Sequence, residues 1–182
     1  MATDEEKWYV MKAANNRALS TKREILDPRS IVSFVPMKQS LELDRRGVKQ
    51  WRTTPIFSNL VFVKTTQSTL WKLDQAYPHL YASYDRTLGN LGKREFITIP
   101  TETMEEFIAF VEGNISNLKD VEIADLNLKK GEKVRVTSGA FEGRIATLVS
   151  VKGKRSKQIV AMIDGFVAVM ATCDFTVERI EA

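Results

Sequence analysis

The sequence has very little of what redox or metal chemistry requires. Its 182 residues include one cysteine, Cys173, and one histidine, His79. A single cysteine excludes an internal disulfide, and one histidine leaves no Cys/His cluster of the kind that binds zinc. We therefore expect both side chains to pack without chemistry, and we expect no metal and no cofactor.

Long apolar runs are also missing. No stretch approaches the ~18 consecutive apolar residues that a membrane-spanning helix needs. Residues 1–7 are charged and are not followed by the apolar segment of a signal peptide. These absences predict a soluble, cytoplasmic protein that has no membrane partner.

A catalytic arrangement of side chains is absent as well. The chain offers no convincing Ser/His/Asp, Cys/His or paired-carboxylate set, because the only histidine follows Pro78 and the only cysteine lies in a late predicted strand. Residues 89–93 share the GxxG spacing of an RNA-clamping loop, but they lie between predicted strands, where a turn is expected. We do not expect an enzyme.

Positive charge is present in modest excess. The formal net charge is +4 and the pI is about 9.2, which is compatible with binding to nucleic acid without requiring it. Two basic clusters stand out: residues 152–157, and the set Arg45, Arg46, Lys49 and Arg52. Each cluster is either a phosphate-binding surface or a solvated hairpin tip.

Strand-like and helix-like patterns interleave as far as Gly113. Hydrophobic residues make up 43% of the chain, which suffices for packed cores. Strands are expected at 8–11, 31–37, 56–63, 79–84 and 96–99, and helices at 18–26, 68–77 and 101–113. This order predicts an α/β sandwich, an antiparallel sheet with three helices, over residues 1–116.

From Lys133 onward every segment is short, alternating and strand-like. Strands are expected at 134–136, 145–151, 159–163, 167–170 and 177–180. They predict a small five-stranded β-barrel over residues 129–182. Residues 117–128, which are polar with isolated aliphatic side chains, are expected to be a linker. The predicted fold class is therefore α+β, a sandwich followed by a barrel.

Two stretches of the first domain are candidate binding surfaces. Pro55 cannot donate a hydrogen bond to a strand neighbour, so the strand is expected to begin after it, with Ile56 and Phe57 at its entrance. A large aromatic side chain in that place is either core or docking surface. In the helix at 18–26 the outward face is basic, and its cations spread over about one turn: Arg17, Lys22 and Arg23.

A glycine-rich segment carries the most specific motif of the second domain. One glycine opens a strand of alternating valines, a second permits a turn, and a third lets the next strand bend. The pattern closely resembles the KOW motif, here Gly131, Val134, Val136, Gly139, Phe141 and Gly143.

The chain as a whole resembles the NusG family of transcription elongation factors. Trp8-Tyr9-Val10, the segment 55–63, Trp71 and the KOW segment follow in the family's order and spacing. The resemblance implies an N-terminal NGN domain that binds the clamp of RNA polymerase and suppresses pausing, with polymerase contacts at Ile56, Phe57 and Leu60. It also implies that the basic helix, with Arg17, Lys22 and Arg23, meets DNA in the elongation complex.

Two details concern the subclass and the partner of the barrel. The Ser58-Asn59 step and the form Phe34-Val35-Pro36-Met37 resemble specialised paralogues related to RfaH and to the UpxY antiterminators of polysaccharide operons. The family's KOW (SH3-like) barrel recruits a ribosomal protein or Rho, but this chain has Asp164-Gly165-Phe166 where the family commonly has Phe-Gly-Arg. The alternatives are a housekeeping NusG and an RNA-binding, ribosome-associated KOW protein that uses residues 152–157.

Overall fold

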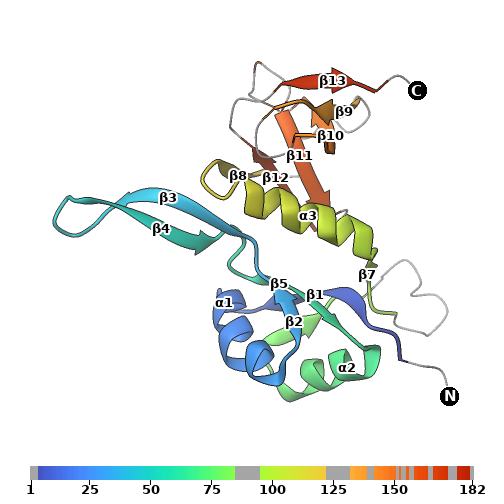
Figure 1. The fold of residues 1–182 in the computed structure, drawn as a ribbon. Coiled ribbons are helices and arrows are strands. Elements are labelled where there is room, and N and C mark those ends of the chain that lie inside the picture. The colour runs from blue at the N-terminus through green and yellow to red at the C-terminus, as the bar shows by residue number, and fades with distance from the viewer. Residues whose placement is uncertain are drawn as a thin grey trace. The chain divides into compact units, whose positions relative to one another are not determined.

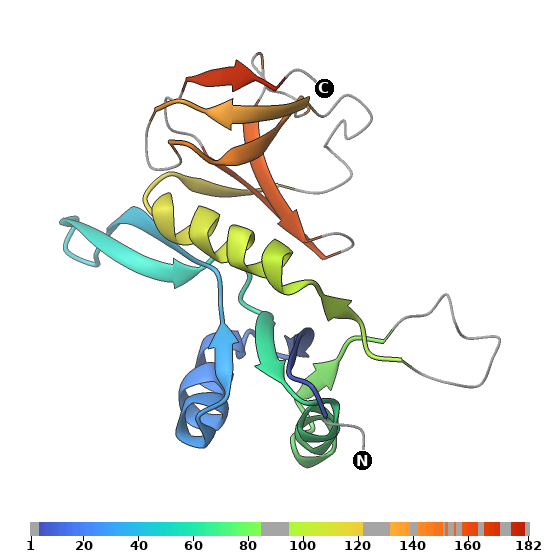
Figure 2. The ribbon, with the colours of Figure 1, turned by 45° about the vertical axis from the view of Figure 1, so that its right-hand side comes forward.

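The computed structural model describes residues 4–84, 95–121, 132–138, 142–150, 152, 155, 158–163, 166–171 and 176–180. The chain divides into two compact units. The first consists of Met1–Pro36 and Phe57–Met104, and the second of Met37–Ile56 and Glu105–Ala182. The elements of each unit can be followed from two sides (Figure 1, Figure 2).

An antiparallel sheet forms the core of the first unit. Its strands are β1 (Lys7–Ala13), β2 (Val32–Phe34), β5 (Leu60–Thr65), β6 (Leu80–Ala82) and β7 (Thr98–Ile99). β1 is central, because it pairs with β5 on one edge and with β6 and β7 on the other. Successive side chains of β1 and β5 are buried, as expected where both faces of a strand are covered: Val10, Met11, Val61, Phe62 and Val63.

Two helical segments of the first unit lie against this sheet. The expected helix at 18–26 is present as α1 (Ala18–Thr21), which continues as a π-helical turn (Lys22–Leu26) and a 3₁₀ turn (Asp27–Arg29). α1 contacts β1 and β5, and α2 (Gln67–Ala76) contacts β6. No helix in the described part of the chain is long and apolar enough to cross a membrane.

Two side chains cap the start of α2. Thr66 is the N-cap, and its Oγ1 accepts a hydrogen bond from the Thr69 N–H at 3.3 Å. The carboxylate of Asp4 accepts from the N–H groups of Gln67 and Ser68, both at 3.2 Å, and from the Ser68 hydroxyl. The residues before β1 therefore hold the N-terminus of α2.

β5 begins later than the sequence pattern predicts. The preceding strand, β4 (Lys49–Pro55), ends at Pro55, and residues 56–59 form a bend and a turn before Leu60. The Ser58 carbonyl accepts a hydrogen bond from the Ala18 N–H at 2.9 Å. The prediction of a strand from Ile56 is wrong, because the backbone at Ser58 binds the start of α1 instead of continuing a ladder.

The second unit contains a hairpin and a sheet of six strands. The hairpin consists of β3 (Met37–Leu43) and β4. The boundary between the two units falls within α3 (Thr101–Gly113), between Met104 and Glu105. The sheet has the order β13-β9-β10-β11-β12-β8. Its strands are β8 (Leu118–Val121), β9 (Glu132–Val136), β10 (Ile145–Val149), β11 (Gln158–Ile163), β12 (Val167–Ala171) and β13 (Val177–Arg179).

The five strands expected from Lys133 onward are confirmed, and β8 is an addition. β8 lies in the segment expected to be a linker, where it pairs with β12 from Leu118↔Ala171 to Val121↔Ala168. The rest of that segment, 122–128, is outside the described residues. β13 and β8 stand at the two ends of the strand order, so closure into a barrel stays a prediction.

Candidate functional site

The turn before α1 is tied to the segment that precedes β5. Asn15 and Asn16 both adopt left-handed backbone conformations, with φ of 57° and 58°. The Ser58 hydroxyl donates to Oδ1 of Asn16 at 2.7 Å, and the Asn59 carbonyl accepts from the Ala13 N–H at 2.8 Å. These bonds fix the position from which α1 departs, and hence the direction of its side chains.

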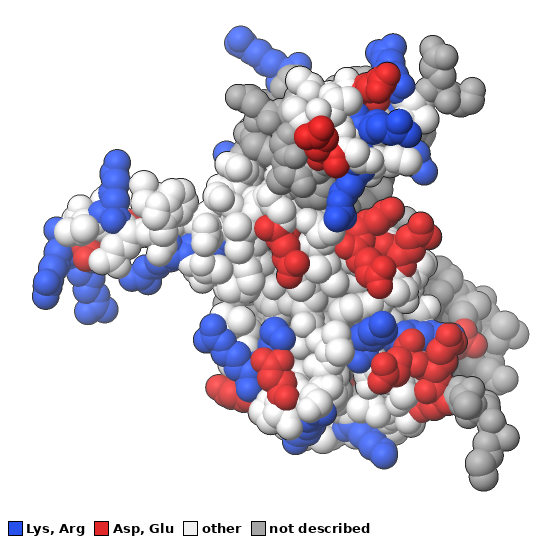
Figure 3. All heavy atoms as spheres, in the orientation of Figure 1, with Lys and Arg blue, Asp and Glu red and all other residues white. Residues whose placement is uncertain are grey.

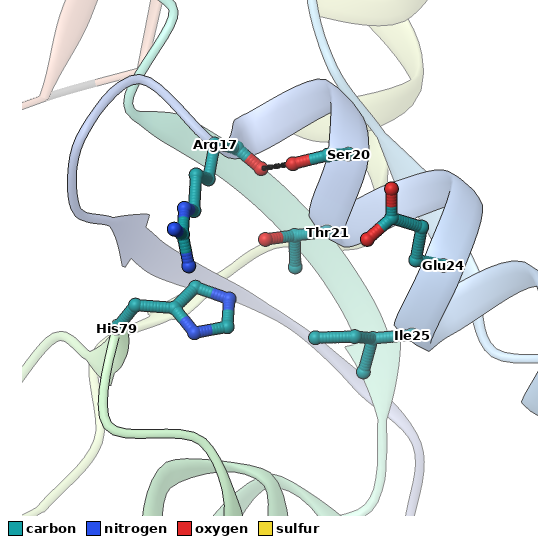
Figure 4. Close-up of a pocket in the computed structure, with 6 residues that line it drawn as sticks. All are labelled: Arg17, Ser20, Thr21, Glu24, Ile25 and His79. Atoms are coloured by element: carbon teal, nitrogen blue, oxygen red, sulfur yellow. Dashed lines mark hydrogen bonds between the residues drawn. The ribbon is translucent and has the colours of Figure 1, made fainter.

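A pocket of about 360 Å³ opens beside α1 (Figure 4). One of its walls is a helical face, because residues 17, 20, 21, 24 and 25 recur at the three- and four-residue spacing of one side of a helix. The other wall is His79, held just before β6 by a hydrogen bond from the Ala14 N–H to its carbonyl at 2.8 Å. The lining residues are Arg17, Ser20, Thr21, Glu24, Ile25 and His79.

The pocket has donors and acceptors for a polar ligand. Arg17 and His79 lie together on one side of it, and the Glu24 carboxylate lies on the other (Figure 4). The Thr21 hydroxyl is buried, the residue being 1% exposed, and it has no hydrogen-bond partner within the described part of the protein. A buried hydroxyl left in this way costs about 1 to 3 kcal/mol, so a polar group that entered the pocket would gain by bonding to it.

The three predicted DNA-binding cations are not equivalent. Arg17 lines the pocket, whereas Lys22 and Arg23 are not among its lining residues. The ammonium group of Lys22 forms an ion pair with Asp27 at 2.8 Å and donates to the Ser33 hydroxyl at 3.3 Å. Lys22 is therefore partly neutralised within the protein, while Arg23 is exposed in the π-helical turn.

The predicted polymerase-binding residues differ in burial. Ile56 and Phe57 are half-buried and lie in the bend after β4, not at the start of a strand. Leu60 is the first residue of β5 and is only 6% exposed, so it belongs mainly to the core of the first unit. Of the three, Ile56 and Phe57 keep surface that a partner can contact.

The predicted KOW residues are described in part. Val134 and Val136 are buried in β9, in agreement with the alternating pattern. Gly143 has φ of +84° in the turn between β9 and β10, a conformation that favours glycine, and its N–H donates to the Val136 carbonyl at 2.7 Å. Gly131, Gly139 and Phe141 lie outside the described residues, as does most of the basic segment 152–157.

Comparison with protein-family models gives two matches. The NusG model, described as transcription termination factor nusG, matches residues 6–108, which is more than half of the chain. The chain belongs to the NusG family. A KOW motif model matches residues 130–162. NusG domains are those of transcription elongation and termination factors, not of an enzyme family. A search of curated proteins gave no match.

For this member of the NusG family, the sequence pattern missed several residues of the pocket. Ser20, Thr21 and Glu24 share a helical face with Arg17, so helical spacing could have grouped them. His79 could not have been added in this way. Its place depends on the pairing of β6 with β1, which joins segments far apart in the chain.

Proposed function

We propose that this chain is a transcription elongation and antitermination factor whose N-terminal domain binds the clamp of RNA polymerase and suppresses pausing or termination. The observation that carries the proposal is the NusG match over residues 6–108, followed by a KOW motif at 130–162. Ile56 and Phe57, which are half-buried in a bend, supply the apolar contact. Burial of an aromatic side chain at the centre of an interface supplies much of its affinity.

DNA in the elongation complex is the second partner that we propose. Arg17 would contact it from the pocket, and Arg23 from the exposed side of the π-helical turn. Lys22 would contribute less, because it already pairs with Asp27. Two or three phosphate contacts give weak binding by themselves, so polymerase must supply most of the affinity.

The testing experiment is co-elution of the full chain with core RNA polymerase after treatment with ribonuclease. An elongation factor of this kind stays bound without RNA. An RNA-binding, ribosome-associated KOW protein would be released by the same treatment, so loss of co-elution would contradict the proposal.

We also propose three parts for the chain: an N-terminal domain over 1–116, a linker at 117–128 and a KOW domain over 129–182. β8 lies in this linker and pairs with β12 of the KOW domain. The polymerase contact then lies in the N-terminal domain. A fragment of residues 1–116 should bind polymerase, while a fragment of residues 129–182 should not. The KOW domain would be free to recruit a ribosomal protein or Rho.

A specialised role on long operons, such as those for polysaccharide biosynthesis, is supported by the Ser58-Asn59 step. The Ser58 hydroxyl donates a hydrogen bond to Asn16, and the Ser58 carbonyl accepts one from the Ala18 N–H at the start of α1. The Pro-Gly step that is usual in housekeeping NusG has no hydroxyl for the first of these bonds. Genome-wide mapping of the protein on transcribed DNA tests this role: a few long operons should be occupied, whereas occupancy of most transcripts would indicate the housekeeping role.

A further inference from the structure

One face of the β3–β4 hairpin is apolar and exposed. The register places Leu41 opposite Trp51 and Leu43 opposite Lys49. Residues directly opposite in an antiparallel pair share a face, so these four side chains stand together. Their exposure is high for apolar residues: 49% for Leu41, 67% for Leu43 and 64% for Trp51.

The acidic groups of the hairpin are occupied within it. Glu42 forms an ion pair with Arg52 at 3.7 Å. Oδ1 of Asp44 accepts hydrogen bonds from the N–H groups of Arg46 and Val48, at 2.8 and 2.9 Å, and so stabilises the tip turn that Gly47 completes with φ of +78°. The two carboxylates thus shape the hairpin. Arg52 offsets the charge of Glu42, whereas Asp44 stays anionic at the tip, where Arg45 and Arg46 follow it in sequence.

Three cations lie between the exposed indole and the tip of the hairpin. Arg45 and Arg46 lie at the tip, and Lys49 is on the same strand face as Trp51, about 7 Å along β4. Figure 3 shows this concentration of basic side chains at the end of the hairpin. Within the described residues no ion pair engages Arg45, Arg46 or Lys49.

We propose that this hairpin face binds single-stranded nucleic acid, with a base stacked on Trp51 and the flanking phosphates on Lys49, Arg45 and Arg46. An exposed aromatic ring bordered by cations is the arrangement by which proteins hold single strands without sequence preference. A duplex offers no free base face to stack on the Trp51 indole, because its bases are already stacked on one another. An apolar protein partner would use the leucines and the indole but would leave three cations unmatched.

The proposal rests on the function proposed above only for the source of the strand, which is either displaced DNA or nascent RNA. Binding itself can be measured without polymerase. The assay is fluorescence anisotropy of labelled oligo(dT) and oligo(U) with the full chain. A preference for one of them identifies the source, and equal affinity fits recognition by stacking and charge.

The decisive variant is Trp51→Leu, which keeps an apolar side chain and removes the ring. We expect it to weaken binding of both oligonucleotides by roughly tenfold, and we expect Trp51→Phe to retain most of the affinity. Trp71→Leu is the matched control, because Trp71 is also an exposed tryptophan but lies on α2 of the first unit. It should bind as the wild type does.

Charge variants provide a second measurement. Lys49→Gln should lower the slope of log affinity against log salt by about 0.7 on a single strand, whereas the control Lys72→Gln on α2 should not change it.

Unchanged oligonucleotide affinity in Trp51→Leu, with an unchanged melting temperature, would overturn the proposal. So would loss of polymerase co-elution in Trp51→Leu without loss of oligonucleotide binding, since that result would make the hairpin a protein-docking surface. Phe57→Ala should show the opposite separation, with polymerase binding lost and oligonucleotide binding kept.

Discussion

The α1 pocket of the first unit and the β3–β4 hairpin of the second arise from stretches that are both basic, yet their charges are arranged in opposite ways. Beside α1, Lys22 pairs with Asp27 and Arg17 lines a pocket that also contains Glu24, while Arg23 is exposed. In the hairpin the carboxylates are engaged, by Arg52 and by backbone N–H groups. The first arrangement suits a ligand with both donors and acceptors, and the second suits a polyanion. Counting cations in a segment does not distinguish the two.

We assign the main polymerase contact to Phe57 and not to the α1 pocket or to the β3–β4 hairpin. The variant Phe57→Ala tests this assignment and has the largest expected effect. The variant should weaken polymerase binding by about 2 to 4 kcal/mol, the range of an aromatic anchor at the centre of an interface. Titration of fluorescent polymerase measures the change. Tyr81→Ala, which removes an exposed aromatic side chain from β6, is the control and should have little effect. Wild-type affinity in Phe57→Ala would place the anchor elsewhere.

The α1 pocket, unlike the hairpin, contains a buried hydroxyl without a hydrogen-bond partner among the described residues, that of Thr21. The variant Thr21→Val tests whether this hydroxyl costs stability. Replacing the hydroxyl by a methyl group should raise the free energy of unfolding by about 1 kcal/mol, because the desolvated oxygen is removed. Urea denaturation measures it. Ser20→Ala should give no gain, since the Ser20 hydroxyl already donates to the Arg17 carbonyl at 3.1 Å. A Thr21→Val variant that is more stable but is recruited less to paused elongation complexes would mark the hydroxyl as a ligand contact.

Salt dependence on paused elongation complexes separates the cations beside α1. Arg23→Ala should lower the slope of log affinity against log salt by about 0.9 if Arg23 contacts duplex phosphate. Lys22→Ala should change the slope less, because its ammonium group already pairs with Asp27. Equal losses in the two variants would show that Lys22 leaves Asp27 to bind DNA, and the contrast between α1 and the hairpin would then disappear.

The smallest expected effect is a pH dependence confined to the first unit. The hydrogen bond from the Ser68 hydroxyl, opposed in part by desolvation, holds the pKa of the Asp4 carboxyl below its ordinary value. A depressed folded pKa contributes stability above the unfolded pKa of about 3.9, and that stability is lost as the pH falls through the folded value. Acid should therefore loosen the N-terminus of α2 and leave the hairpin unchanged. Hydrogen exchange of the Gln67 and Ser68 amides against pH checks this, and Asp4→Asn should abolish the dependence.

Much of the fold could be predicted because burial leaves a simple pattern. Val134 and Val136 alternate with polar residues and are buried in β9, and the helix at 101–113 buries Met104, Phe107 and Val111 as its spacing predicts. The start of β5 could not be predicted, because the Ser58 carbonyl is bound by an N–H group forty residues earlier in the chain. A local pattern contains no information about such a bond.

The candidate sites were less predictable than the fold. Helical spacing places Arg17 on the face that lines the pocket, but His79 reaches it only through strand pairing. Trp51 has no pattern of its own. Lys49 and Trp51 share a face because side chains alternate along β4, but the leucines opposite them, Leu41 and Leu43, are placed there by the register of β3 with β4, which a single strand does not reveal.

The pairing of β8 with β12 has a consequence for the order in which the chain folds during synthesis. Leu118 pairs with Ala171, so β8 must wait until the ribosome has made the strands that separate the two in sequence. The β3–β4 hairpin closes through a short turn and can form as soon as it emerges. The hairpin can therefore present its cations and exposed apolar side chains while the sheet of its own unit is still incomplete, since β8 covers the edge of β12 that β11 does not.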